Sequence, residues 1–314
     1  ADPRVTTPEH LAVLTGLGFT RISLGVQDVD ATVQELIGRH QTAEQTESLY
    51  TDARRLGFGS INMDLIYGLP GQDERSLDAT LDTILRLRPD RLAVYSFAFL
   101  PGSRTHQKRI DPSRIPDRDV KFALLALIVT RLTAAGYRHV GMDHFSLPSD
   151  ELTVAAAEGT LTRNFMGYTT KRGTDVVGLG SSGISDLAGA YVQGHRRLAS
   201  YYAAVDAGRL PVERGVRLDA DDLLRREVIT ELMGNSRVDL AAVAARRGVD
   251  GAGYFRHELD LLAAPGGLVE EGMAVVDGGV VAATELGRLF IRRVAAVFDA
   301  YTTRRKGQVF STAV

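Results

Sequence analysis

The stretch that decides the fold is SINMDLIY at residues 60–67, closed by the turn Gly68-Leu69-Pro70-Gly71. A short apolar run bounded by turn residues predicts a β-strand. Similar runs occur elsewhere in the first half of the chain, at residues 19–26 (FTRISLGV), 91–100 (RLAVYSFAFL) and 137–142. Because strands of a parallel sheet that are buried on both faces read as nearly continuous apolar runs, these segments predict such a sheet.

Amphipathic helical patterns separate the predicted strands. They cover residues 30–56, 76–87 and 119–135, and another at residues 8–15 precedes the first strand. Strands alternating with helices predict right-handed βαβ units. Three or four strands are too few for a closed barrel. We therefore expect an α/β fold with a parallel sheet that is cut at its N-terminal side.

The pattern changes in the second half of the chain. Residues 177–215 read as a connecting segment, with a Gly-rich stretch at 177–185 (VGLGSSGIS) that indicates close backbone packing or approach of a ligand. From residue 216, several helical patterns precede a hairpin turn at Asp277-Gly278-Gly279 and a helix that begins after Thr284. We expect residues 1–176 to contain the parallel sheet and residues 216–314 to be a helical, winged-helix-like domain.

The composition excludes several classes of site and partner. The net charge of −2 gives no general attraction to nucleic acid or anionic membranes, and no apolar run is long enough for a membrane span. The first five residues lack an apolar signal core, so we expect a cytoplasmic location. With no cysteine and no ligand spacing among the histidines, we predict no metal ligand in this chain.

Polar residues at the predicted strand ends are candidates for a site. Gln27 follows one apolar run and Asp64 lies inside another, and each needs a partner. Ligand contact and an internal hydrogen bond both remain open for them. Asp143-His144 indicates a structural or substrate-contact role. The segment RNFMGYTT at residues 163–170 would suit a large, flat, acidic ligand, although packing on the sheet explains it equally well.

These motifs, GVQD (25–28), IYGLP (66–70), GMDHF (141–145) and RNFMGYTT (163–170), resemble those of the oxygen-independent coproporphyrinogen III oxidases. Members of that family are radical S-adenosylmethionine enzymes of haem biosynthesis, described as a partial (βα) barrel with a helical C-terminal domain. The resemblance covers essentially the whole chain, and it implies that residues 1–176 are the later portion of a partial (βα) barrel of parallel strands, truncated at its N-terminal side. It implies oxidative decarboxylation of two propionates of coproporphyrinogen III to vinyls, initiated by a 5′-deoxyadenosyl radical.

The resemblance also implies a set of binding residues. The expected contacts of S-adenosylmethionine are Gln27, Arg39, Asp64, Ala98 and Ile184, although Arg39 by itself reads as part of a solvated helix face. For the substrate we assign Arg163 and Tyr168. The resemblance assigns no catalytic residue, electron donor or electron acceptor in this chain.

The chain departs from the family at one decisive point. The family's CxxxCxxC loop, which holds a 4Fe-4S cluster, precedes an Asp-Pro-Arg segment, and here the chain begins at Ala1-Asp2-Pro3-Arg4. We expect a fragment or an N-terminally truncated gene model that is inactive alone. Its unpaired sheet edge should make the isolated chain poorly soluble or partly disordered before residue 60. The alternatives are a cluster-free tetrapyrrole- or S-adenosylmethionine-binding protein, such as a haem-chaperone-like relative, and a DNA-binding winged-helix region.

Overall fold

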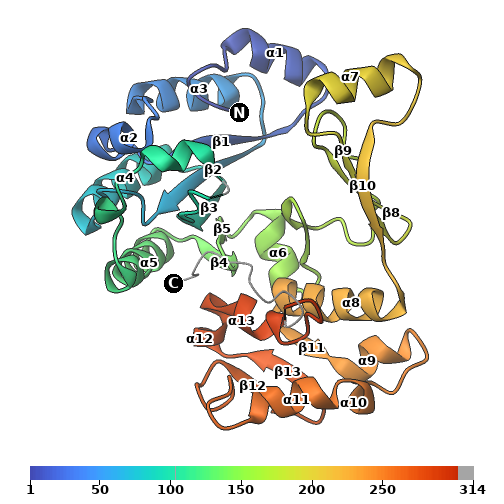
Figure 1. Ribbon diagram of the computed structural model, residues 1–314. Helices are drawn as coiled ribbons and strands as arrows, with labels where there is room; N and C mark the ends of the chain where they lie inside the picture. Colours follow the sequence, from blue (N-terminus) through green and yellow to red (C-terminus); the bar gives the residue numbers. More distant parts are fainter. Residues whose placement is uncertain (103, 303–314) are drawn as a thin grey trace. The chain divides into compact units, whose positions relative to one another are not determined.

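The computed structural model describes residues 1–102 and 104–302, which form two compact units that divide after Ala157. The first unit is a sheet with helices packed against it (Figure 1). Its strands are β1 (Arg21–Gln27), β2 (Ser60–Tyr67), β3 (Arg91–Ser96), β4 (Arg138–Gly141) and β5 (His144–Ser146). Its helices are α1 (Pro8–Gly16), α2 (Ala31–Ile37), α3 (Ala43–Arg55), α4 (Glu74–Leu87), α5 (Arg118–Ala134) and α6 (Glu151–Ala157), with short 3₁₀ turns η1 (Thr105–Arg109) and η2 (Pro112–Arg114).

The sheet of the first unit has the strand order β1-β2-β3-β5-β4. β1, β2 and β3 are parallel, so the predicted α/β class with a parallel sheet is confirmed. β5 was not predicted. The chain turns back after Gly141, and β5 inserts between β3 and β4, antiparallel to both.

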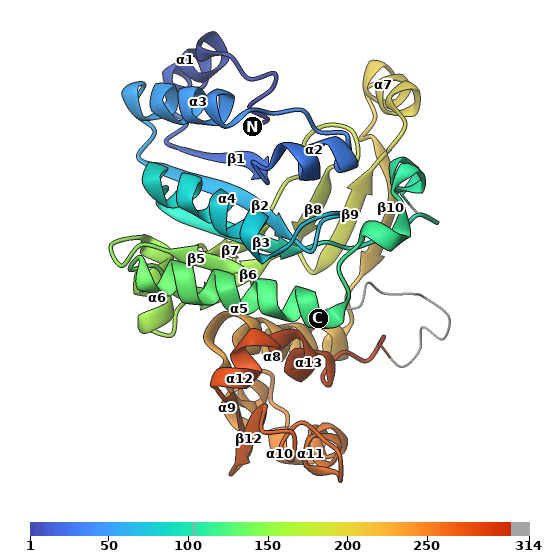
Figure 2. The same ribbon diagram turned by 90° about the vertical axis from the view of Figure 1, so that its left-hand side faces the viewer.

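Burial alternates in β1 and β2, so the expectation of strands buried on both faces is wrong for them, whereas β3 buries Leu92, Ala93 and Val94 in succession. In β2 the residues Ile61, Met63 and Leu65 are fully buried, while the residues between them are only partly buried. The buried set packs under α3, α4 and α5, which cover one face of the sheet (Figure 2). The other face carries polar side chains, because successive residues of a strand point to opposite faces.

The single helix expected over residues 30–56 is two helices. α2 ends at Gly38, whose φ of 66° lies in the left-handed region that glycine adopts without strain. α3 begins after Thr42, which forms a capping box with Gln45. The break places Arg39 in the connection between the two helices rather than on a helix face.

The free edge of β1 is partly paired, which corrects the expectation of an open edge there. The Ala1 amino group donates to the Ser23 carbonyl at 2.6 Å, and Gly25 N–H donates to the Ala1 carbonyl at 2.9 Å. This is the bonding pattern of a parallel strand pair. The expectation of poor solubility or partial disorder before residue 60 stays a prediction.

The second unit contains two antiparallel three-stranded sheets and a hairpin, in orders β10-β9-β8, β11-β13-β12 and β6-β7. Its strands are β6 (Thr162–Asn164), β7 (Gly167–Thr169), β8 (Ile184–Leu187), β9 (Ala190–Gly194), β10 (Val212–Arg217), β11 (Arg237–Asp239), β12 (Ala274–Asp277) and β13 (Val280–Ala283). Its helices are α7 (Leu198–Asp206), α8 (Ala220–Asn235), α9 (Leu240–Ala245), α10 (Gly251–Tyr254), α11 (Arg256–Ala263), α12 (Glu285–Leu289) and α13 (Ile291–Ala296).

Most elements predicted for the C-terminal part are present. The hairpin β12–β13 turns through Gly278 and Gly279, both with positive φ, and Thr284 caps α12 as expected. The last helix does not run on to Tyr301, because α12 and α13 are separated at Phe290. The division after Ala157 lies earlier than the boundary expected at residue 176, since the β6–β7 hairpin packs on α8. In the described ranges no helix combines the length and apolar character needed to cross a bilayer.

Gly287 packs tightly against the backbone of Met273 in the C-terminal part. A Cβ at position 287 would overlap with the Met273 carbonyl oxygen. We expect Gly287→Ala to lower the free energy of unfolding by about 2 kcal/mol in urea denaturation, because overpacking forces the backbone to shift. Gly16→Ala is the control, since Gly16 has open space around it and ends α1. Equal stabilities of the two variants would contradict the prediction.

Candidate functional site

The site lies on the face of the first unit's sheet that the helices leave open. Gly25, Asp64, Ala93 and His144 are register neighbours on β1, β2, β3 and β5, so they form one row across four strands. The row crosses the middle of β2 and β3. Gln27 lies beyond it at the carboxyl end of β1, the edge at which the sequence predicts a binding site.

Gln27 ends β1 in an unusual conformation. Its φ is 70°, a left-handed conformation that costs a non-glycine residue about 1 kcal/mol, and the β1–β2 register shifts between Gly25 and Gln27. The Gln27 Nε2 atom lies 3.0 Å from the position a Cβ would take on Gly25. Gly25 therefore leaves room for the Gln27 side chain to fold back over the strand.

Arg39 is mostly buried, so its interpretation as a solvated surface residue is wrong. Its Nη2 atom donates to the Gly25 carbonyl at 2.6 Å and to Gln41 Oε1 at 3.0 Å, and it lies 3.3 Å from Asp2 Oδ1. Burial lowers the pKa of the guanidinium. Arg39 Nε is buried without a hydrogen-bond partner among the described residues, so the side chain keeps a donor for a further acceptor.

Asp64 is held by two neighbours on the same open face. Ser23 Oγ donates to Asp64 Oδ2 at 3.0 Å, and Asn62 Nδ2 donates to Asp64 Oδ1 at 2.7 Å. Asn62 Nδ2 also lies 2.9 Å from Ser23 Oγ, which closes a three-residue cluster. Neither Ser23 nor Asn62 was singled out from the sequence, although the alternation of polar and apolar residues in both strands carries that signal.

Ala98 and Ile184, the other expected cofactor contacts, lie in different units. Ala98 follows the end of β3, and its carbonyl accepts a hydrogen bond from Gln107 Nε2 at 2.9 Å. Ile184 begins β8 in the second unit. A Cβ on Gly178 would lie about 2.5 Å from the Ile184 backbone, which supports close backbone packing as the role of that glycine. Four of the five expected residues therefore belong to the first unit.

A fully buried carboxyl supports the loop that carries Gln27, and sequence reasoning missed it. Asp28 accepts hydrogen bonds from Asp30 N–H, Thr80 Oγ1 and Gln72 Nε2 at 2.6–2.8 Å. Gln72 Oε1 in turn accepts from the Gly68 amide. Burial raises the pKa of Asp28. The carboxyl thus connects the end of β1 to the turn that follows β2.

Asp143 and His144 form a close pair. His144 Nδ1 lies 2.5 Å from Asp143 Oδ1, and the His144 ring meets Tyr95 edge-on at 6.3 Å. A carboxylate on one ring nitrogen fixes the orientation of an imidazole. No cluster of three or more potential metal ligands occurs in the part of the chain that the structure describes. The geometry is that of an oriented histidine on the open face.

Arg163 and Tyr168 lie opposite each other in the β6–β7 hairpin of the second unit. Tyr168 is buried and its hydroxyl donates to the Met233 carbonyl at 2.9 Å, so this group already has a role within the protein. The Arg163 guanidinium lies 5.7 Å from the centre of the Tyr168 ring. Arg163 Nε is buried without a hydrogen-bond partner among the described residues.

Comparison with known proteins identifies the family. A family model described as the radical SAM superfamily matches residues 1–84. The chain is 43% identical over 314 residues to the oxygen-independent coproporphyrinogen III oxidase of Thermostichus vulcanus, covering all of this chain and 96% of that protein. It is 40% identical to the Escherichia coli K12 protein of the same name, covering all of this chain and 68% of that protein.

The fold agrees with the sequence match. A solved structure of coproporphyrinogen III oxidase from Escherichia coli, described as a radical SAM enzyme, superposes with a TM-score of 0.92 at 41% identity. The superposition covers 96% of this chain and 69% of that one. The chain belongs to the oxygen-independent coproporphyrinogen III oxidase family. It spans about two thirds of the length of the Escherichia coli relative.

The residues of this family member fit one of the two implied cofactors. An unpartnered Arg39 donor and the Asp64 carboxylate suit the carboxylate and the hydroxyl groups of S-adenosylmethionine. The iron–sulfur cluster does not fit, because the 314 residues contain no cysteine thiolate to ligate it. Chemistry that depends on the cluster is therefore not assigned to any residue of this chain.

Asp2, whose carboxylate lies beside Arg39, should contribute to the stability of the fold in a pH-dependent way. The Arg4 guanidinium, hydrogen-bonded to Asp2, lowers the pKa of that carboxyl to about 2. A depressed pKa stabilises the folded state above the unfolded pKa, and the contribution is lost as the pH falls from about 4 through about 2. We expect the stability difference between wild type and Asp2→Asn in urea to be constant from pH 8 to 5 and to shrink steadily as the pH falls from about 4 to about 2. A difference as large near pH 2 as at pH 7 would contradict this.

Proposed function

We propose that this chain forms the S-adenosylmethionine-binding and substrate-binding part of an oxygen-independent coproporphyrinogen III oxidase, which converts coproporphyrinogen III to protoporphyrinogen IX in haem biosynthesis. The observation that carries the proposal is the match of the whole chain, at 43% identity, to a protein of that name. The polar groups on the open face support it, because the Asp64 carboxylate provides acceptors and Arg39 provides a donor for a polar cofactor.

The reaction defines what the protein must hold. Converting one propionate to a vinyl group releases CO₂, one proton and two electrons. When bound, S-adenosylmethionine supplies the group that abstracts the hydrogen atom, so the protein's contribution is to orient both molecules. With no thiolate in the chain, we expect these 314 residues alone to bind the ligands without oxidising the substrate.

Each proposed contact has a stated role. Arg39 would pair with the carboxylate of S-adenosylmethionine and Asp64 would accept from its hydroxyl groups, with Gln27, Ala98 and Ile184 as further contacts. Arg163 would pair with a substrate carboxylate beside Tyr168. We also propose a cytoplasmic enzyme without a nucleic-acid or membrane partner, and we assign no electron donor or acceptor.

Cofactor binding is tested by calorimetric titration of the full chain with S-adenosylmethionine. We expect Arg39→Met to raise the dissociation constant by about tenfold or more, because a charge-assisted hydrogen bond is lost. Arg55→Met on α3 is the matched control, since Arg55 is exposed and pairs with Asp52 on the same helix. Equal binding by both variants would overturn the assignment of Arg39.

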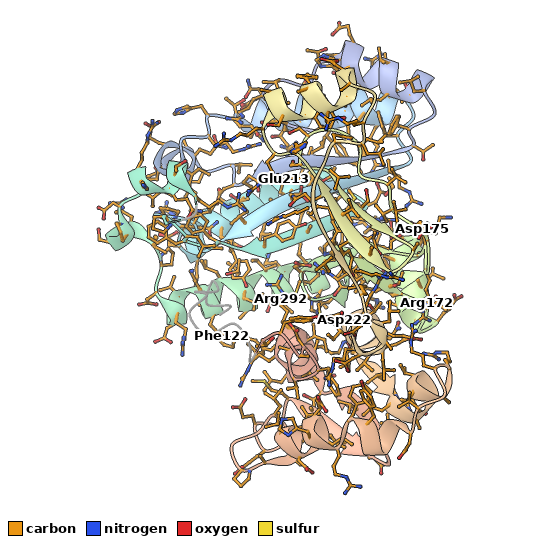
Figure 3. The ribbon with its side chains drawn as sticks, turned by 45° about the vertical axis from the view of Figure 1, so that its right-hand side comes forward. Phe122, Arg172, Asp175, Glu213, Asp222 and Arg292 are labelled. Atoms are coloured by element: carbon orange, nitrogen blue, oxygen red, sulfur yellow. The ribbon has the colours of Figure 1, made fainter. Side chains whose placement is uncertain are left out.

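Substrate binding is tested by anaerobic equilibrium dialysis with coproporphyrinogen III. We expect Arg163→Ala to weaken binding by about tenfold. Arg172→Ala is the control: Arg172 lies on the loop after β7 (Figure 3), is half exposed, and pairs with Glu231. If Arg172→Ala weakened substrate binding and Arg163→Ala did not, the proposed role of Arg163 would be contradicted.

A further inference from the structure

Asn62 is an unfavourable choice for its position in the sheet. It lies in the middle of β2, a parallel strand whose other face is packed in the core, and asparagine is poorly suited to strands. Its Oδ1 atom is buried and has no hydrogen-bond partner among the described residues. A buried acceptor without a donor destabilises the fold. Residues that violate local rules in this way are concentrated at functional sites.

The amide group of Asn62 has only one workable orientation. Its Nδ2 atom lies 2.7 Å from Asp64 Oδ1 and 2.9 Å from Ser23 Oγ. Turning the amide over would place Oδ1 against the Asp64 carboxylate, so two acceptors would face each other without a proton. The orientation with the orphaned Oδ1 is therefore imposed by Asp64.

The two neighbours fix both oxygens of the Asp64 carboxylate. Asn62 donates to Oδ1, and Ser23 donates to Oδ2 at 3.0 Å from the adjacent strand. Because β1 and β2 are paired in register at Ser23 and Asn62, both donors sit on rigid strands. Each carboxylate oxygen keeps a further lone pair for a ligand donor. The carboxylate is thus held in one plane before any ligand arrives.

We propose that Asn62, assisted by Ser23, is a positioning residue that pre-orients Asp64 to accept hydrogen bonds from hydroxyl groups of S-adenosylmethionine. The inference rests on the proposed function, because it concerns the Asp64 contact assigned there. Pre-orientation raises affinity by removing the ordering of the side chain from the binding step. The buried Asn62 Oδ1 atom without a hydrogen-bond partner lowers the stability of the fold, and this loss is the cost of the arrangement.

The test is a double-mutant cycle on the full chain, with calorimetric titration of S-adenosylmethionine. We expect Asn62→Val to raise the dissociation constant about five- to tenfold and Asp64→Asn to raise it about tenfold or more. In the Asn62→Val/Asp64→Asn double variant, the Asn62 change should add nothing, because it acts through Asp64. Ser60→Val is the matched control, on the same strand and the same face but outside the cluster, and it should leave binding unchanged.

The outcomes separate the inference from the function on which it rests. The positioning role is overturned if Asn62→Val binds S-adenosylmethionine within twofold of wild type. It is also overturned if Asn62→Val lowers the affinity equally in the wild-type and Asp64→Asn backgrounds. In both cases the proposed contact of Asp64 with the cofactor stands. No effect of Asp64→Asn, or no binding by wild type, overturns the proposed cofactor contact and the inference with it. Thermal unfolding of each variant verifies folding. If Asn62→Val collapses the melting transition, Ser23→Ala decides instead: a loss of affinity smaller than that expected for Asn62→Val supports positioning, and unchanged binding overturns it.

Discussion

The first unit depends on one constraint: its parallel strands are covered by helices on only one face. Ile61, Met63 and Leu65 of β2 face α3, α4 and α5, and this apolar layer holds the strands in register. The residues between them must then face a surface without helices, where polar side chains are tolerated. Asn62 and Asp64 lie there for that geometric reason. The core and the site are therefore two faces of the same strands.

Buried polar groups link this sheet to the loops at its carboxyl ends. Asp28, fully buried, accepts three hydrogen bonds and keeps the end of β1 against the turn after β2. The same loop contains Gln27 in its left-handed conformation, which persists because its surroundings are fixed. Arg39 reaches back to the Gly25 carbonyl from the α2–α3 connection. Binding groups from separate segments are thus held together by the fold.

Much of the fold and part of the candidate site were predictable from the sequence, and the features that were not predictable have physical explanations. The β2 strand, the parallel order of β1 to β3 and the Thr284 cap follow from local patterns. The family resemblance, which pointed to Gln27, Arg39 and Asp64, was needed because Arg39 on its own reads as solvated. β5 escaped prediction because a three-residue strand has almost no periodic signal. The Ser23–Asn62–Asp64 cluster depends on register between strands, which no single segment encodes.

The most direct test of the account is hydrogen exchange of the full chain with and without S-adenosylmethionine, read by mass spectrometry. The account predicts slower exchange in peptides that contain Gly25–Gln27, Arg39 and Asn62–Tyr67, because binding rigidifies the loops and strand ends around the open face. The β12–β13 hairpin should exchange at the same rate in both states. Protection confined to that hairpin, or no protection at saturating ligand, would contradict the claim that the open face of the sheet is the binding site.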